Sequence, residues 1–148
     1  MSSNSRPRRT IDANKDIVNP TQKLLSKRSK RKSQNGIRFI IWADDQGRIR
    51  AFELSGHAGY ADSGQDIVCA GVSALSIAAY NGLEHFLSVA PKVQEADGYL
   101  TCQLVGIPEQ ELEKAQWILQ TMTLGIEQIL STYSQDYIFI DRRRWTPC

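Results

Sequence analysis

The sequence contains little cysteine, few aromatic residues and no long hydrophobic run. Its 3 cysteines in 148 residues are an odd number, which argues against a disulfide framework. The uninterrupted apolar runs are far shorter than the roughly 18 residues of a membrane-spanning helix, so no such helix and no membrane partner is expected. The length excludes a two-domain enzyme of about 300 residues, and a hydrophobic content of 41% suits one folded domain.

Residues 1–36 contain no Phe, Tyr or Trp and almost no acidic residues. They hold 10 Lys or Arg and 2 Asp, a net charge of +8, whereas residues 37–148 hold 8 Lys or Arg and 14 Asp or Glu, a net charge of −6. The formal charge of +2 is therefore an average over two unlike segments. Because a segment with so few apolar side chains cannot offset the entropy of ordering, we expect a disordered basic tail over 1–36 and one domain over 37–148.

Three interpretations of this tail are open. It is a solvated segment without function, an arm that contacts the phosphates of ribosomal or other nucleic acid, or a transit peptide, for which a basic, Ser-rich and acid-poor composition is typical. A phosphate-binding arm would lose affinity steeply as salt is added. Without the apolar core of a secretory signal or a disulfide pattern, the chain is predicted to be cytoplasmic, or stromal in an organelle if the tail is a transit peptide.

Turn signals and apolar periodicity predict an α+β fold for residues 37–148. Asp44–Gly47 and Asp97–Gly98 are turns that each join two strands into a hairpin. The predicted order is ββαββα with a trailing strand, a two-layer sandwich in which two helices pack on one face of a mostly antiparallel sheet. The expected strands span 37–43, 48–54, 92–96, 99–105 and 137–140, and the expected helices span 66–88 and 108–133.

Each predicted helix carries one apolar face, because large apolar residues recur at steps of three and four. Pro108 suits the first helical position of the second helix, and the acidic residues after it suit the positive end of the helix dipole. The first face consists of Val68, Val72, Leu75, Ala79, Leu83 and Phe86, and the second of Leu112, Ala115, Leu119, Met122, Ile126 and Ile129.

The residues that carry chemistry gather between Gly56 and Ser73. His57 ends a predicted strand and Cys69 begins a predicted helix, with a glycine-bearing loop between them. A free thiol has a pKa of about 8.5, and the N-terminus of a helix favours its thiolate form. A nearby imidazole takes the thiol proton and later protonates the leaving amine. Free backbone N–H groups at Cys69 and its neighbours are expected to bind a developing oxyanion.

Two neighbours of Cys69 each have two open roles. As an N-cap, Asp66 accepts a hydrogen bond from the Cys69 N–H; as a catalytic partner, it orients His57 in the manner of a Ser-His-Asp triad. Ser73 lies one turn after Cys69 on the same helix face. Its hydroxyl either bonds its own helix or lines the site.

A purely structural interpretation also stands beside the catalytic one. A lone cysteine on a helix is usually core filler, and a lone histidine after a strand is often a satisfied polar residue. Cys102 shares a strand face with apolar residues and is expected in the core, Cys148 is terminal, and His85 suits the C-terminal end of its helix. Since no CxxC pair and no metal-ligand spacing occur, no metal and no cofactor are expected.

The segments Ser55–Ala58 and Asp66–Ala70, followed by Val72 and Ser73, resemble the signature of the bacterial ribosomal-processing cysteine protease family Prp. The resemblance covers about residues 37–144, and the spacing between the two segments and the order of elements fit as well.

In this family a histidine and a cysteine form the catalytic dyad, which the resemblance places at His57 and Cys69. The remaining positions that it implies as supporting or substrate-binding are Asp66, Ser73, Gly56, Gly59 and Ala70.

The resemblance implies a small homodimeric endopeptidase. Members of the family remove an N-terminal extension from large-subunit ribosomal protein number twenty-seven, cutting after an aromatic residue, and their loop between the histidine and the cysteine closes on substrate. Gly56, Gly59 and Gly64 suit such a hinge. The basic tail is not part of the family domain. The alternative function is a non-catalytic ribosome-associated module that residues 1–36 tether to ribosomal RNA.

Overall fold

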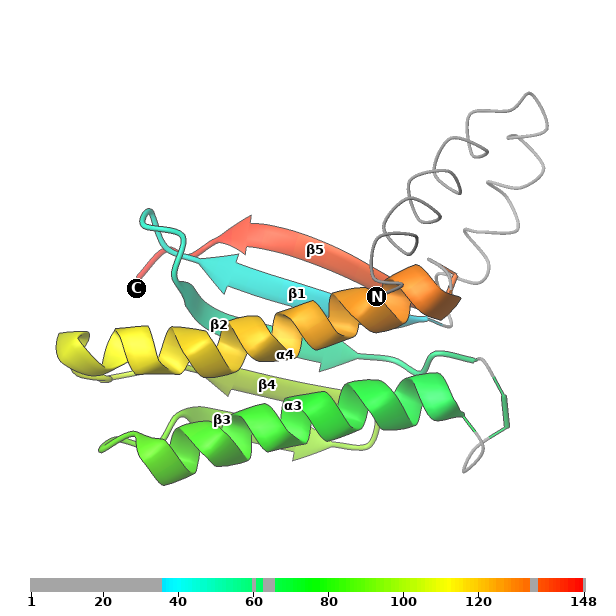
Figure 1. The fold of residues 1–148 in the computed structure, drawn as a ribbon, viewed down its shortest axis with the longest axis horizontal. Helices are drawn as coiled ribbons and strands as arrows, with labels where there is room; N and C mark the ends of the chain where they lie inside the picture. The colour runs from blue at the N-terminus through cyan, green and yellow to red at the C-terminus, as the bar shows by residue number, and fades with distance from the viewer. Residues whose placement is uncertain (1–35, 60, 63–65, 134–135, 148) are drawn as a thin grey trace, which may run out of the picture.

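The computed structural model describes most of the predicted domain (Figure 1). The predicted basic tail, apart from Gly36, and the positions Gly64 and Cys148 lie outside the described residues, so what the sequence predicts for them stays a prediction. The described residues are 36–59, 61–62, 66–133 and 136–147.

The fold has two layers, a five-stranded sheet and a pair of helices that cover one of its faces (Figure 1). The strand order is β3-β4-β2-β1-β5. All neighbouring strands are antiparallel except β1 and β5, which are parallel. The predicted α+β sandwich is therefore confirmed. The strands are β1 (Ile37–Ala43), β2 (Ile49–Ser55), β3 (Lys92–Ala96), β4 (Tyr99–Gln103) and β5 (Ile138–Arg144).

Two long helices, α3 (Ile67–Phe86) and α4 (Leu112–Tyr133), lie side by side across the sheet, and a short 3-10 turn, η2 (Glu109–Glu111), precedes α4. Both turn the faces that the periodicity predicts toward the core, although Leu75 and Ile129 are only partly buried and Phe86 is exposed. Phe86 is 58% exposed because it is the last residue of α3, where the chain leaves the helix layer for β3 of the sheet.

Several element boundaries differ from the predicted ones. β5 continues to Arg144 instead of ending at Ile140, because it pairs in parallel with the whole length of β1. Pro108 has an extended ψ of 140° and lies before η2, so it is not the first helical residue. α3 and β4 each end two residues earlier than predicted, and β2 is displaced by one residue.

By length and composition alone, α3 is apolar enough to cross a membrane, with a mean hydropathy of 1.3 over its best window. This differs from the expectation of no such helix, because polar residues interrupt the apolar runs of α3. Core helices pass the same test, and α3 buries Val68, Val72 and Leu83 against the sheet and α4. The finding is therefore weak evidence for a membrane span.

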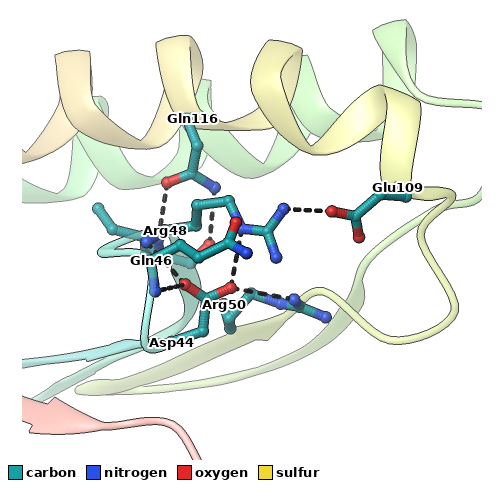
Figure 2. Close-up of polar contacts among 7 residues, drawn as sticks. Asp44, Gln46, Arg48, Arg50, Glu109 and Gln116 are labelled. Carbon is teal, nitrogen blue, oxygen red and sulfur yellow. Dashed lines mark hydrogen bonds and ion pairs between the residues drawn. The ribbon is translucent and has the colours of Figure 1, made fainter.

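A polar cluster ties α4 to the turn between β1 and β2 (Figure 2). The Asp44 carboxylate accepts hydrogen bonds from the backbone N–H groups of Gln46 (2.9 Å) and Arg48 (3.0 Å). The buried Gln116 amide accepts from the Ile49 N–H (2.6 Å) and donates to the Ile49 carbonyl (2.9 Å), as a neighbouring strand would. We call this group the hairpin cluster; its members are Asp44, Gln46, Arg48, Arg50, Glu109 and Gln116.

Candidate active site

A cleft of about 180 Å³ lies where α3 faces the ends of β2, β3 and β4. Its apolar lining comes from both layers of the fold, and polar side chains from both layers face it as well. The apolar side chains include Ile37, Leu54, Val72, Ile77 and Leu100, and the polar ones include His57, Cys69, Ser73, Glu95 and Asp97. The fold therefore brings the two residues of the predicted dyad to one cleft.

Cys69 lies in the first turn of α3, and Asp66 is the N-cap of this helix. The Asp66 carboxylate accepts a hydrogen bond from the Cys69 N–H at 2.9 Å, and the Asp66 carbonyl accepts one from the Ala70 N–H at 3.0 Å. The capping role predicted for Asp66 is thus confirmed. The predicted free N–H at Cys69 is wrong, because the cap already uses it.

The thiol of Cys69 receives a hydrogen bond from the other side of the cleft. The backbone N–H of Ala58 donates to Sγ over 3.1 Å, and Ala58 itself is only 2% exposed. Because Ala58 directly follows His57, this contact holds the end of the β2 segment against the start of α3. A backbone donor aimed at a sulfur atom is positioned to stabilise negative charge on that sulfur or beside it.

Burial raises the pKa of the Cys69 thiol, the Ala58 N–H lowers it, and the Asp66 carboxylate raises it again. The balance lies above the ordinary value. The helix N-terminus was expected to favour the thiolate, but the carboxylate that caps the helix opposes this effect. A thiol with a raised pKa needs a base that removes its proton before the sulfur can attack as a nucleophile.

His57 is exposed and lines the cleft at the point where β2 ends. Its position depends on two glycines. Gly56 has a φ of +89°, and a Cβ there would lie 2.5 Å from the carbonyl oxygen of Gly36. The Gly56 N–H donates to the carbonyl of Gly98 in the β3–β4 turn over 2.9 Å. The end of β2 thus bends sharply and is pinned to a neighbouring turn.

The remaining predicted site residues divide into two groups. Ser73 and Gly56 line the cleft together with the predicted dyad. Gly59 and Ala70 are exposed and are not among the cleft-lining residues. The hinge predicted for the glycines of the intervening loop remains a prediction.

The β3–β4 hairpin also contributes to this site, which the sequence does not indicate. Glu95 and Asp97 line the cleft, and the Tyr80 hydroxyl of α3 donates to the Glu95 carboxylate over 2.9 Å. A Cβ built on Gly98 would fall 2.8 Å from Nε2 of His57, so this glycine lies beside the imidazole. The Asp-Gly pair was visible as a turn signal, but nothing in the sequence indicates which side chain the turn faces.

Within the described part of the chain, no three His, Cys, Asp or Glu side chains are arranged to hold a metal ion. Cys102 is 2% exposed on β4, and burial raises the pKa of its thiol to about 12. This agrees with the core position expected for Cys102 and makes it a poor nucleophile.

A cysteine in the first turn of a helix and a histidine in the same cleft define the class of this protein as a candidate thiol hydrolase on an α+β sandwich. Comparisons with known proteins agree. The model of the family described as Cysteine protease Prp matches residues 37–138.

Two curated relatives carry the name Ribosomal processing cysteine protease Prp. The one from Staphylococcus aureus is 32% identical over 98 residues, which cover 65% of this chain and 90% of the relative. The one from Bacillus subtilis is 33% identical over 91 residues, which cover 60% of this chain and 81% of the relative.

Solved structures share the fold. The Staphylococcus aureus protease with a covalently linked product peptide has a TM-score of 0.65 at 28% identity and covers 72% of this chain and 99% of its own. The protein SMU.848 from Streptococcus mutans has a TM-score of 0.62 at 30% identity and covers 76% of this chain and 98% of its own. The chain belongs to the Prp family of cysteine proteases, which confirms both the resemblance and the predicted enzyme class.

Proposed function

We propose that this protein is an endopeptidase that uses a Cys69–His57 dyad to remove the N-terminal extension of large-subunit ribosomal protein number twenty-seven. The observation that carries the proposal is that both residues line one cleft, with the Ala58 N–H at 3.1 Å from the Cys69 sulfur. Support for a peptide substrate comes from the Staphylococcus aureus relative, which has been solved with a substrate peptide and with a covalently linked product peptide.

The reaction runs in two halves. His57 accepts the Sγ proton of Cys69, and the sulfur attacks the carbonyl carbon of the scissile bond. The tetrahedral intermediate collapses, the C–N bond breaks, and His57 gives its proton to the leaving amine. Water then attacks the thioester, with His57 taking one water proton and returning it to the departing sulfur. The products are an acid, an amine and the free thiol.

The developing oxyanion needs a donor, and the Cys69 N–H is already bonded to Asp66. The Ala58 N–H donates a hydrogen bond to the sulfur, so it also lies near the oxygen of the carbonyl group that the sulfur attacks. We assign this N–H to the oxyanion. A single such donor contributes on the order of 10²–10³ in kcat.

Peptide cleavage tests the proposal. A peptide spanning the N-terminus of the ribosomal protein from the same genome is incubated with the enzyme, and the products are identified by mass spectrometry. Wild type should cut once, after an aromatic residue, whereas Cys69→Ala and His57→Ala should leave the peptide intact with an unchanged circular dichroism spectrum. His85→Ala, at the other end of α3, is the matched control and should cut normally. Cleavage that persists in Cys69→Ala would sink the proposal.

The charge of residues 1–36 favours a second candidate function, in which this segment tethers the protein to ribosomal RNA. A net charge of +8 suits binding to ribosomal RNA through phosphate contacts. Salt-dependent co-sedimentation with ribosomes that is lost on deleting residues 1–36, yet intact in Cys69→Ala, would support it. The two functions are compatible, because the tail would bring the protease to its substrate.

We also propose a homodimer that forms through the outer face of α4. Trp117 and Leu124 are 67% and 66% exposed and lie seven residues apart, on one side of the helix. Light scattering after gel filtration should show a dimer that Trp117→Ser disrupts and that the control Lys92→Ala, at an exposed position on β3, leaves intact. A reduced thiol requires a reducing compartment, so we place the enzyme in the cytoplasm, with an organelle stroma as the alternative.

A further inference from the structure

The β3–β4 turn lies directly against the imidazole of His57. If a Cβ is built on Gly98, it falls 2.8 Å from Nε2, 3.3 Å from Cε1 and 3.5 Å from Cδ2 of this ring. Approaches under 3.0 Å are essentially never seen for a Cβ, and the three nearest atoms all belong to the exposed His57 ring, so a side chain at position 98 displaces the imidazole. The Cα of Gly98 therefore forms one wall of the space that the ring occupies.

The turn is also fixed in place relative to the strand that carries His57. The Gly56 N–H donates to the Gly98 carbonyl over 2.9 Å, so the residue before His57 is bonded to the glycine beside its ring. On the other side, the Ala58 N–H is bonded to the Cys69 sulfur. The backbone on both sides of His57 is thus held, one side to the turn and the other to the nucleophile.

We propose that Gly98 is a positioning residue, which sets the distance and orientation of the His57 imidazole relative to the Cys69 thiol. This inference rests on the catalytic dyad of the proposed function. Gly98 touches neither the substrate bond nor the sulfur in this role. It acts by keeping the space beside the ring free of a side chain while the turn backbone limits how far the ring moves.

The chain supplies matched controls for the strain that a substitution at Gly98 introduces. Gly98 has a φ of +67°, a conformation that an alanine adopts only with strain. Gly47 and Gly106 have φ values of +76° and +68°, and a Cβ at either of them meets nothing within 4 Å. Gly47→Ala and Gly106→Ala therefore carry the same backbone strain without the histidine contact.

A second variant at the same position separates strain from contact. Asparagine tolerates the left-handed region better than alanine does, yet it still carries a Cβ. Gly98→Asn should therefore recover thermal stability relative to Gly98→Ala and still displace the imidazole. If Gly98→Ala fails to fold, Gly98→Asn keeps the test available.

The experiment measures peptide cleavage and the ring resonances of His57 in the full chain. Both Gly98 variants should lose about 100-fold in kcat with KM nearly unchanged, since a misplacement of about 1 Å costs that much. Gly47→Ala and Gly106→Ala should stay within about twofold of wild type. In ¹H–¹⁵N spectra the His57 ring resonances should shift in both Gly98 variants, while those of His85 stay in place.

Either of two results would overturn the positioning role: Gly98 variants that cleave as well as the Gly47 control, or His57 ring resonances that do not move. If wild type itself fails to cleave the peptide, the proposed function is what fails. The ring resonances still report whether the Gly98 variants displace His57, because they are measured without substrate.

Discussion

The two ends of the β1–β2 hairpin are built in contrasting ways. At one end, the hairpin cluster saturates its backbone with side chains: Asp44 bonds two N–H groups of its own turn, and Gln116 bonds both backbone groups of Ile49 (Figure 2). At the other end, the chain leaves the sheet after β2. There the Gly56 N–H donates to the Gly98 carbonyl in the β3–β4 turn, and the Ala58 N–H donates to the Cys69 thiol.

The two ends of the hairpin differ in whether their ionisable side chains are paired with one another. In the hairpin cluster, carboxylate and guanidinium groups neutralise one another; Arg48 pairs with Asp44 at 2.9 Å and also with Glu109. In the cleft, the thiol has one N–H donor and the imidazole is exposed. The first end stabilises the fold, and the second holds groups that can still exchange protons.

The largest expected effect on stability belongs to Gln116 in the hairpin cluster. Gln116→Ala leaves the N–H and the carbonyl of the buried Ile49 without partners, which should cost about 2–4 kcal/mol of the unfolding free energy. This corresponds to a Tm lower by roughly 10 °C. Thermal unfolding followed by circular dichroism measures it, with the exposed Gln120→Ala of the same helix as control.

The same variant sharpens the comparison between the two ends. Below its Tm, Gln116→Ala should cleave peptide at the wild-type rate, because the amide lies at the opposite end of the hairpin from His57. A loss of kcat equal to that of a cleft variant, in a protein that is still folded, would break the proposed division between a stabilising end and a reactive end.

We expect substitutions of Asp66 to have an intermediate effect, because this residue caps α3 and also acts on the Cys69 thiol. Its carboxylate raises the pKa of the Cys69 thiol, so Asp66→Asn should lower that pKa and speed alkylation of Cys69 by iodoacetamide at pH 7. Asparagine still caps the helix, whereas Asp66→Ala should also lose about 1 kcal/mol of stability.

The pair of Asp66 variants also separates the two roles left open by the sequence. If the carboxylate only caps α3, Asp66→Asn should cleave peptide at least as fast as wild type. If it also orients His57, cleavage should fall although alkylation is faster. An alkylation rate that is unchanged in both variants would contradict the electrostatic account of this thiol.

The smallest expected effect is the loss of folding stability at low pH that follows from protonation of Asp44 in the hairpin cluster. Burial raises the pKa of Asp44, but the hydrogen bonds from Arg48 and Gln46 lower it below its ordinary value on balance. A lowered pKa in the folded state stabilises the protein above the unfolded value of about 3.9, and this contribution is lost as pH falls through the folded value.

Asp44→Asn should therefore lose less stability than wild type as the pH falls below about 4, and the difference at pH 7 should stay under about 1 kcal/mol. Urea unfolding across this range measures it. Asp45→Asn is the matched control, because that neighbouring carboxylate is 74% exposed. A steeper acid loss in Asp44→Asn than in wild type would contradict the sign.

Local sequence signals predicted much of this fold and part of the site. The Asp-Gly turns, the apolar helix faces and the N-cap three residues before Cys69 all depend on neighbours in the chain, so they were readable. The extension of β5 to Arg144 was not, because its charged end is held by parallel pairing with the distant strand β1. Gln116 likewise reads as an ordinary helix-surface residue until β2 is placed beneath it.

The cleft shows the same limit. The types and spacing of His57 and Cys69 indicated a dyad, but the donor to the sulfur comes from a backbone group that no side-chain pattern reveals. The wall beside the imidazole belongs to a turn about forty residues further along the chain. Both contacts exist only once the strands are arranged in space.

The most direct test of the central claim is the time course of Cys69 modification. Wild-type enzyme is treated with iodoacetamide, aliquots are mapped by mass spectrometry for the modified fraction of Cys69, and the same aliquots are assayed for cleavage of the ribosomal peptide. The cleft account predicts that the remaining activity equals the unmodified fraction of Cys69 at every time point. Full activity in enzyme whose Cys69 is completely modified would contradict it.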